Sequence, residues 1–181
     1  MKKFELTTNS KMYLGKKLFQ IKALISFGNV EEGDLGGFIE KEDNLSQSGN
    51  AWVYGNARVS GNARVSGNAW VSGNAEVSGN AEVSGNARVY GDAWVSGNAR
   101  VYGDAEVSGN EDYTTIKGFG RNCRNTTFFK SEDGDVKVVC GCFYGTLDEF
   151  RKKVKETHGD SKYATEYLMI ADLMELHFKE D

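Results

Sequence analysis

The last third of the chain holds the residues whose types could bind a metal ion. They are three cysteines and a histidine: Cys123, Cys140, Cys142 and His158. Zn²⁺ accepts a set of three thiolates and one imidazole. The usual C-x₂-C spacing is absent, however, and Cys140 and Cys142 on one strand would share a buried face, where cysteine packs as a small hydrophobic residue. We therefore expect packed cysteines and neither a metal nor another cofactor, with a zinc site as the alternative.

The segment GFGRNCRN, residues 118–125, combines a glycine-rich turn with two arginines, Arg121 and Arg124. Guanidinium groups bind carboxylates and phosphates, so the segment could hold a phosphate of a nucleotide or an acidic patch on a partner protein. The alternative is a solvent-exposed loop that joins the two parts of the chain. No Walker or Rossmann spacing is present. We expect partner or ligand contacts at Arg121, Arg124, Phe128 and Phe129.

No catalytic constellation accompanies these residues. The sequence has only two histidines, His158 and His177, and neither has the spacing of a Ser/His/Asp or Cys/His arrangement. We therefore expect a protein that binds and does not catalyse.

Composition and charge narrow the class of partner. Lysine and arginine number 22 and aspartate and glutamate 26, a formal net charge of −4. None of the segments 1–48, 49–110 and 111–181 is basic, so we expect no non-specific binding to nucleic acid. No apolar run could span a bilayer and no signal-peptide core follows the N-terminus. With three cysteines, an odd number, this predicts a cytoplasmic protein that does not bind membranes.

A hexapeptide repeat dominates the middle of the chain. Ten consecutive copies of Gly-Asn/Asp-Ala-x-Val-x run over residues 49–108, and two degenerate copies precede them at residues 37–42 and 43–48. Ala-x-Val is a short strand whose alanine and valine point inward, and Gly-Asn tolerates the backbone of a tight corner. Three strands and three corners make a coil of eighteen residues. The repeat predicts a left-handed parallel β-helix.

The outward positions of the repeat support this coil length. Residues eighteen apart form three columns, which read Trp52, Trp70, Arg88, Glu106; Arg58, Glu76, Trp94; and Arg64, Glu82, Arg100. The neighbours include an aromatic pair, a cation–aromatic pair and opposite charges, and no like charges are adjacent in any column. Asparagines at one corner, Asn62, Asn80 and Asn98, should stack as an amide ladder.

Large aromatics gather on one face of the predicted β-helix. We expect this face to mediate self-association into a trimer or dimer, through Trp52, Tyr54, Trp70, Tyr90 and Arg88. The alternative is that aromatic residues favour any exposed β surface.

The segments on either side of the β-helix differ from it. Residues 1–36 alternate like strands and should form a β cap over the open end of the β-helix, which spans residues 37–110. Residues 111–181 should form an α+β domain of three strands and two helices. Thr146 and Glu149 make a capping box at the start of the first helix, and Gly159 follows its end. The second helix should run over residues 161–178.

The segment GNVEEGDLGGFIEKEDNLSQSGNAWVYGNARV, residues 28–59, resembles the N-terminal part of YdcK-like hexapeptide-repeat proteins. The matching positions are Gly33, Gly36, Gly37, Phe38, Asn44, Leu45 and Ser46. The resemblance covers residues 28–110 and implies a left-handed β-helix. The combination also resembles many proteins of phages and prophages of Gram-positive bacteria.

The resemblance suggests an accessory role in an infected bacterium. We expect inhibition of a host protein or defence system, by steric occlusion or by capture of a small anionic ligand. Two alternatives remain. The first is an acyltransferase of the hexapeptide type, because some YdcK-like relatives are called acetyltransferases. Hexapeptide acyltransferases place a catalytic histidine on a loop that leaves the coil, and the ten hexads contain no such loop. The second alternative is a structural phage component, although fibre proteins usually have a longer run of repeats than this chain.

Overall fold

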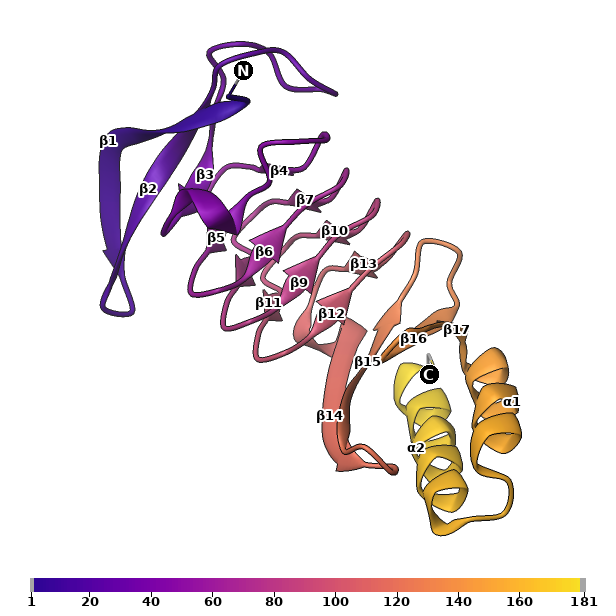
Figure 1. Ribbon diagram of the computed structural model, residues 1–181. Coiled ribbons are helices and arrows are strands. Elements are labelled where there is room, and N and C mark those ends of the chain that lie inside the picture. The colour runs from indigo at the N-terminus through magenta and orange to yellow at the C-terminus, as the bar shows by residue number, and fades with distance from the viewer. Residues whose placement is uncertain (1, 180–181) are drawn as a thin grey trace.

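The structure, a computed structural model that describes residues 2–179, has a parallel β-solenoid at its centre (Figure 1). Each hexad contributes one strand of two residues. These strands are β4 (Trp52–Val53), β5 (Arg58–Val59), β6 (Arg64–Val65), β7 (Trp70–Val71), β8 (Glu76–Val77), β9 (Glu82–Val83), β10 (Arg88–Val89), β11 (Trp94–Val95), β12 (Arg100–Val101) and β13 (Glu106–Val107).

Strand pairing confirms the eighteen-residue coil. Trp52 pairs in parallel with Trp70, Trp70 with Arg88, and Arg88 with Glu106. The other two columns pair in the same way, so that β5, β8 and β11 share one face and β6, β9 and β12 another. The alanine and valine of every hexad between Ala51 and Val107 are buried and form the core.

The corners of the solenoid depend on glycine and asparagine. Gly79 has φ +69°, and an added Cβ would come within 3.0 Å of the backbone of Gly97 in the next coil. Glycine therefore allows neighbouring coils to approach closely. Asn62 donates a hydrogen bond to Asn80 (3.2 Å), which donates to Asn98 (3.1 Å), and this confirms the predicted amide ladder.

The first coil is longer than the others, which corrects the hexad-by-hexad alignment of the two degenerate copies. Phe38 pairs with Arg58, and Leu45 bridges to Val65, so the spacing is twenty residues and not eighteen. The two additional residues lie between Leu45 and Trp52, because Trp52 again pairs with Trp70 at a spacing of eighteen. A 3₁₀ turn, η1 (Glu42–Asn44), forms the corner that precedes Leu45.

An antiparallel sheet covers the first coil, as the sequence predicts. It consists of β1 (Phe4–Tyr13), β2 (Lys16–Ala23) and β3 (Leu35–Ile39), and β3 continues the solenoid sheet by pairing in parallel with β5. Phe4 and Ile21 are fully buried and belong to the solenoid core. The cap and the first coil pack so closely around Gly36 that an added Cβ there would meet the Ile21 side chain and the carbonyl oxygen of Val53.

The C-terminal domain has four antiparallel strands and not the predicted three. They are β14 (Tyr113–Phe119), β15 (Arg124–Lys130), β16 (Val136–Cys140) and β17 (Phe143–Thr146), and they follow a 3₁₀ turn, η2 (Asn110–Asp112). The additional strand arises because the chain reverses at Gly141, where φ is +64°. The sequence pattern instead predicts one strand that continues through Cys142.

Two helices complete this domain, α1 (Leu147–His158) and α2 (Lys162–Phe178), close to the predicted bounds. The capping box of Thr146 and Glu149 is present. None of the helices among residues 2–179 is both long and apolar enough to cross a membrane.

The four-stranded sheet lies between the last coil and the two helices (Figure 1). Phe129 and Val139 belong to the solenoid core, whereas Phe128 and Val138 pack with the helices. Polar contacts join the sheet to the solenoid, including a hydrogen bond from Arg100 N to Thr127 Oγ1 (3.0 Å). The sheet therefore closes the second end of the solenoid.

Candidate functional site

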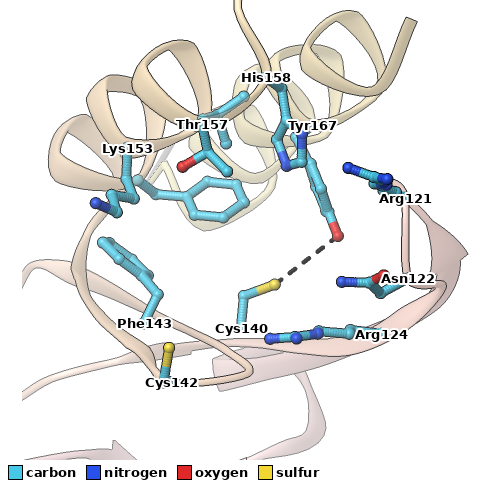
Figure 2. A pocket seen from close by; sticks show the side chains of 12 residues that line it. Arg121, Asn122, Arg124, Cys140, Cys142, Phe143, Lys153, Thr157, His158 and Tyr167 are labelled. Atoms are coloured by element: carbon cyan, nitrogen blue, oxygen red, sulfur yellow. Dashed lines mark hydrogen bonds between the residues drawn. The ribbon is translucent and has the colours of Figure 1, made fainter.

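A pocket of about 270 Å³ opens in the C-terminal domain between the sheet, the helices and the turn that joins β14 to β15 (Figure 2). It is lined by cationic, aromatic and small polar side chains: Arg121, Asn122, Arg124, Cys140, Cys142, Phe143, Phe150, Lys153, Val154, Thr157, His158 and Tyr167. Both arginines predicted to contact a ligand are among them. Figure 2 has Arg121 and Arg124 on one side of the pocket and Phe143 and Lys153 on the other.

The glycine-rich segment forms the hairpin turn between β14 and β15, which corrects the expectation of a loop joining the solenoid to the sheet. Helix α2 holds this turn in place. Gly120 N donates to Glu166 Oε2 (3.0 Å), and Tyr167 Oη donates to the carbonyl of Phe119 (3.2 Å). These contacts fix the backbone of the turn, and the Arg121 side chain extends from this turn toward the pocket.

Arg124 reaches the pocket across the turn between β16 and β17. Its guanidinium lies against Gly141, at the place that a Cβ would fill. Cys140 and Cys142 flank this glycine in the sequence, and both line the pocket together with Arg124. Arg124 is exposed, and within residues 2–179 neither Arg121 nor Arg124 forms an ion pair with a carboxylate. The pocket therefore presents two cations that no side-chain anion within the described part of the chain neutralises.

A row of aromatic rings runs along the pocket. The Phe143 and Phe150 ring centroids are 5.6 Å apart, those of Phe150 and Tyr167 5.5 Å, and those of Tyr167 and His158 5.9 Å. Burial, followed by the neighbouring Cys140 thiol, raises the pKa of Tyr167 to about 12. Its hydroxyl is therefore protonated at neutral pH and can donate to Phe119.

Lys153 adds a third cation at the rim. It is exposed, on helix α1, and pairs with Glu156 at 3.6 Å. Exposed ion pairs of this kind contribute little to stability and exchange readily with a competing anion. The pocket thus combines an apolar aromatic interior with cations on two sides, an arrangement suited to an anion that carries an apolar or aromatic part.

The cysteines and His158 do not form a cluster with ligand geometry. Cys140 accepts a hydrogen bond from Thr126 Oγ1 (3.2 Å), while Cys123 is exposed and does not line the pocket. Among the described residues, no three His, Cys, Asp or Glu side chains lie close enough to hold a metal ion.

Phe128 and Phe129 cannot contact a ligand or partner, contrary to the expectation from the sequence. Both side chains are fully buried. They are neighbours on β15, so they point to opposite faces of the sheet, and both faces are covered. Consecutive aromatic residues on a strand are the pattern of a sheet that is buried on both sides.

Trp52 is also wrongly assigned to the self-association face. It is 1% exposed, because the cap covers it and Phe4 and Phe27 pack edge-on against its ring at 6.2 and 5.4 Å. The equivalent Trp70, one coil further, is partly exposed and stacks on Tyr54 at 5.2 Å.

The other two residues of the predicted face have partners within the chain. Tyr90 Oη donates to Glu106 (2.8 Å), and exposed Arg88 pairs with Glu132 (3.2 Å). Self-association through Tyr54, Trp70, Arg88 and Tyr90 stays a prediction.

The sequence pattern did not indicate six of the residues that line the pocket: Phe143, Phe150, Lys153, Val154, Thr157 and Tyr167. Five of them lie on the two helices that the sequence predicts correctly. The sequence predicts the second helix, but only the tertiary arrangement brings Tyr167 on this helix to the arginine turn.

Comparison with known families identifies the repeat. Four overlapping or neighbouring segments, residues 51–67, 57–73, 81–97 and 93–109, match the family described as YdcK Beta solenoid repeat. The matched segments cover less than half of the chain, and over them the regular coils are similar to repeats of the YdcK β-solenoid type. These segments do not include the C-terminal domain, where the pocket lies. No curated protein matches the chain.

Proposed function

We propose that this chain is a non-enzymatic binding protein that captures a small anionic ligand in the pocket of its C-terminal domain. The observation that supports this function is the pair of arginines, Arg121 and Arg124, at one aromatic-lined pocket without a carboxylate partner among the described residues. Guanidinium groups form charge-assisted hydrogen bonds with phosphate and carboxylate oxygens, and these are stronger than neutral ones.

The surroundings of the histidines favour binding over acyl transfer. His158 packs against Tyr163 and Tyr167, with ring centroids 6.2 and 5.9 Å away, and His177 lies edge-on to Phe178. Both histidines belong to helices of the C-terminal domain and lie outside the regular coils. An acyltransferase of the hexapeptide type would instead need a base beside the solenoid, where acceptor and acyl donor meet.

We place this activity in a bacterium infected by a phage, because residues 28–59 resemble phage and prophage proteins. Capturing a small anion would deprive a host protein or defence system of a metabolite or signal. Steric occlusion of a host protein is the second form of the proposal, and exposed Arg121 and Arg124 would contact that partner. We further propose a cytoplasmic homo-oligomer. A structural phage component, the alternative, would assemble without limit and would not require the pocket.

An NMR titration tests the proposed function. Ribose 5-phosphate is added to ¹⁵N-labelled protein at low ionic strength, and amide shifts are followed. We expect saturable shifts at residues 118–125 and 140–143, which are lost in the double variant Arg121→Gln/Arg124→Gln. The control, Arg64→Gln/Arg100→Gln, removes the same charge from the solenoid. Equal loss in the control, or no shift at the pocket in the unmodified protein, would contradict the proposal.

A further inference from the structure

The ligand class follows from how cations and aromatic rings are distributed in the pocket. We infer that the anion is a mononucleotide, with its phosphate on Arg121 and Arg124 and its base against Phe143. This inference rests on the proposed function, because it names the class of anion that the same pocket holds.

The phosphate side is the one with two guanidinium groups. Arg121 leaves the β14–β15 turn and Arg124 begins β15, and in Figure 2 both lie on the same side of the pocket as Asn122. The two planar guanidinium groups and the Asn122 side-chain amide can donate hydrogen bonds to several oxygens of one phosphate group at once. A carboxylate has only two oxygens to accept these donors, so a phosphate uses the arrangement more fully.

The opposite side is aromatic. The Phe143 ring is half-buried, whereas Phe150 behind it is 3% exposed. Phe143 therefore offers a ring face to a ligand, while Phe150 supports it at 5.6 Å with the two planes inclined by 52°. A bare phosphate or a sugar phosphate would leave this ring in contact with water. A planar base would cover it, and stacking of this kind tolerates any of the bases.

Size and charge exclude larger anions. A volume of about 270 Å³ lies just below the range of about 300–1,000 Å³ typical of small-molecule pockets, and so suits one nucleoside-sized group but not two. A long polyanion would meet a chain of net charge −4. Glu156 and Glu166 also lie next to the pocket, paired with Lys153 and bonded to Gly120. Nucleic acid therefore fits less well than a single nucleotide.

Calorimetric titration of the full chain separates this inference from the proposed function. The probes are AMP, GMP, CMP and UMP, together with ribose 5-phosphate and adenosine. We expect at least one nucleoside monophosphate to bind at least about tenfold more tightly than ribose 5-phosphate, because stacking adds to the phosphate contacts. Adenosine, which lacks the phosphate, should bind more weakly than AMP.

Two variants locate the base. Phe143→Leu should abolish the advantage of nucleotides over ribose 5-phosphate while leaving affinity for ribose 5-phosphate within about twofold, because aliphatic side chains do not stack. The control is Tyr144→Leu, which removes the next aromatic residue, an exposed one. Equal thermal melting of both variants excludes unfolding as the cause.

The possible outcomes are distinct. Equal affinity for nucleotides and ribose 5-phosphate overturns the mononucleotide inference and keeps the proposed function. Binding of adenosine as tight as that of AMP overturns both, because the anion then contributes nothing. An unchanged nucleotide preference in Phe143→Leu also overturns the inference, and no binding of any probe overturns both.

Discussion

The guanidinium of Arg124 lies against the bare Cα of Gly141, in the turn that separates Cys140 from Cys142. A Cβ at Gly141 would overlap Nη1 of this arginine and come 3.1 Å from its Cζ. The same glycine has φ +64°, which closes the turn between β16 and β17. One residue thus sets both the fourth strand of the sheet and the path by which Arg124 reaches the pocket.

Gly141→Ala should therefore weaken anion binding without removing any charged group. We expect the affinity for ribose 5-phosphate or a bound nucleotide to fall about tenfold, as for the loss of one charge-assisted hydrogen bond. Gly134→Ala is the matched control, because Gly134 also has positive φ, +83°, and no atom lies within 4 Å of its added Cβ. The two variants should lose similar stability. If both bind the anion equally well, Arg124 does not act from this position.

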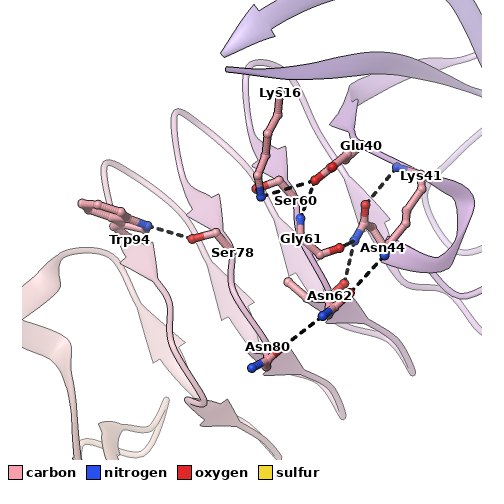
Figure 3. A network of polar contacts seen from close by, with 11 residues as sticks. Lys16, Glu40, Lys41, Asn44, Ser60, Gly61, Asn62, Ser78, Asn80 and Trp94 are labelled. Carbon is pink, nitrogen blue, oxygen red and sulfur yellow. Dashed lines mark hydrogen bonds and ion pairs between the residues drawn. The ribbon is translucent and has the colours of Figure 1, made fainter. Parts of the chain in front are cut away.

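Asn44→Ala should destabilise the solenoid more than loss of any exposed corner asparagine. Asn44 is fully buried and donates to the carbonyls of Gly61 (3.1 Å) and Ala63 (2.9 Å), while its oxygen accepts from Lys41 N (3.0 Å) (Figure 3). Its removal leaves buried groups unpaired, and we expect a loss of about 3 kcal/mol in the free energy of unfolding.

Asn62→Ala serves as the comparison for Asn44→Ala. Asn62 is exposed and belongs to the corner ladder, where water can replace the lost amide, so we expect a loss of about 1 kcal/mol or less. Urea unfolding of both variants measures the difference. Equal losses would mean that the first, longer coil does not depend on the buried amide.

Trp52 and Trp70 should respond differently to substitution although they occupy the same position in consecutive coils. Trp52→Ala empties a buried site under the cap, so we expect a loss of about 3–5 kcal/mol in the free energy of unfolding. Trp70→Glu changes a partly exposed side chain next to Arg88 and should leave the fold intact. If this face mediates self-association, sedimentation velocity should show a smaller species for Trp70→Glu. An unchanged assembly in that variant contradicts self-association through this face.

The solenoid could be predicted because its information is local and repeated. Each hexad carries its own inward alanine and valine and its own corner, and the outward columns set the coil length, as the pairing of Arg58 with Glu76 confirms. The first coil departs from the period because it holds two more residues between Leu45 and Trp52 than the next coil holds between Val65 and Trp70. The hexad pattern does not indicate this insertion.

The pocket could be predicted only in part, because burial depends on distant segments. Trp52 and Trp70 have nearly identical neighbours in sequence, yet only Trp52 lies under the cap. Phe128 and Phe129 lie four and five residues after Arg124 on the same strand, but the helices cover Phe128 and the solenoid covers Phe129. Arg121 and Arg124 were identified from charge and turn chemistry alone. Their aromatic partners come from elements whose packing the sequence does not specify.

Lys3 gives a test of how the cap holds the solenoid. Its side chain is 2% exposed, and Nζ donates to the carbonyl of Ala51 (2.9 Å) and lies 4.8 Å from the centroid of the Phe27 ring. Burial lowers the pKa of this ammonium to about 8, against about 10.4 in an unfolded chain. Between these values the unfolded chain binds more protons, so the free energy of unfolding should rise with pH.

The comparison is between the unmodified protein and Lys3→Met, unfolded with urea from pH 6 to 10. Other groups titrate in both proteins, so the difference between the two free energies isolates Lys3. We expect this difference to be constant below about pH 7 and to move by about 2 kcal/mol in favour of the unmodified protein by pH 10. A difference that stays level to pH 10 would mean that Lys3 keeps its ordinary pKa, and hence that water reaches the ammonium under the cap.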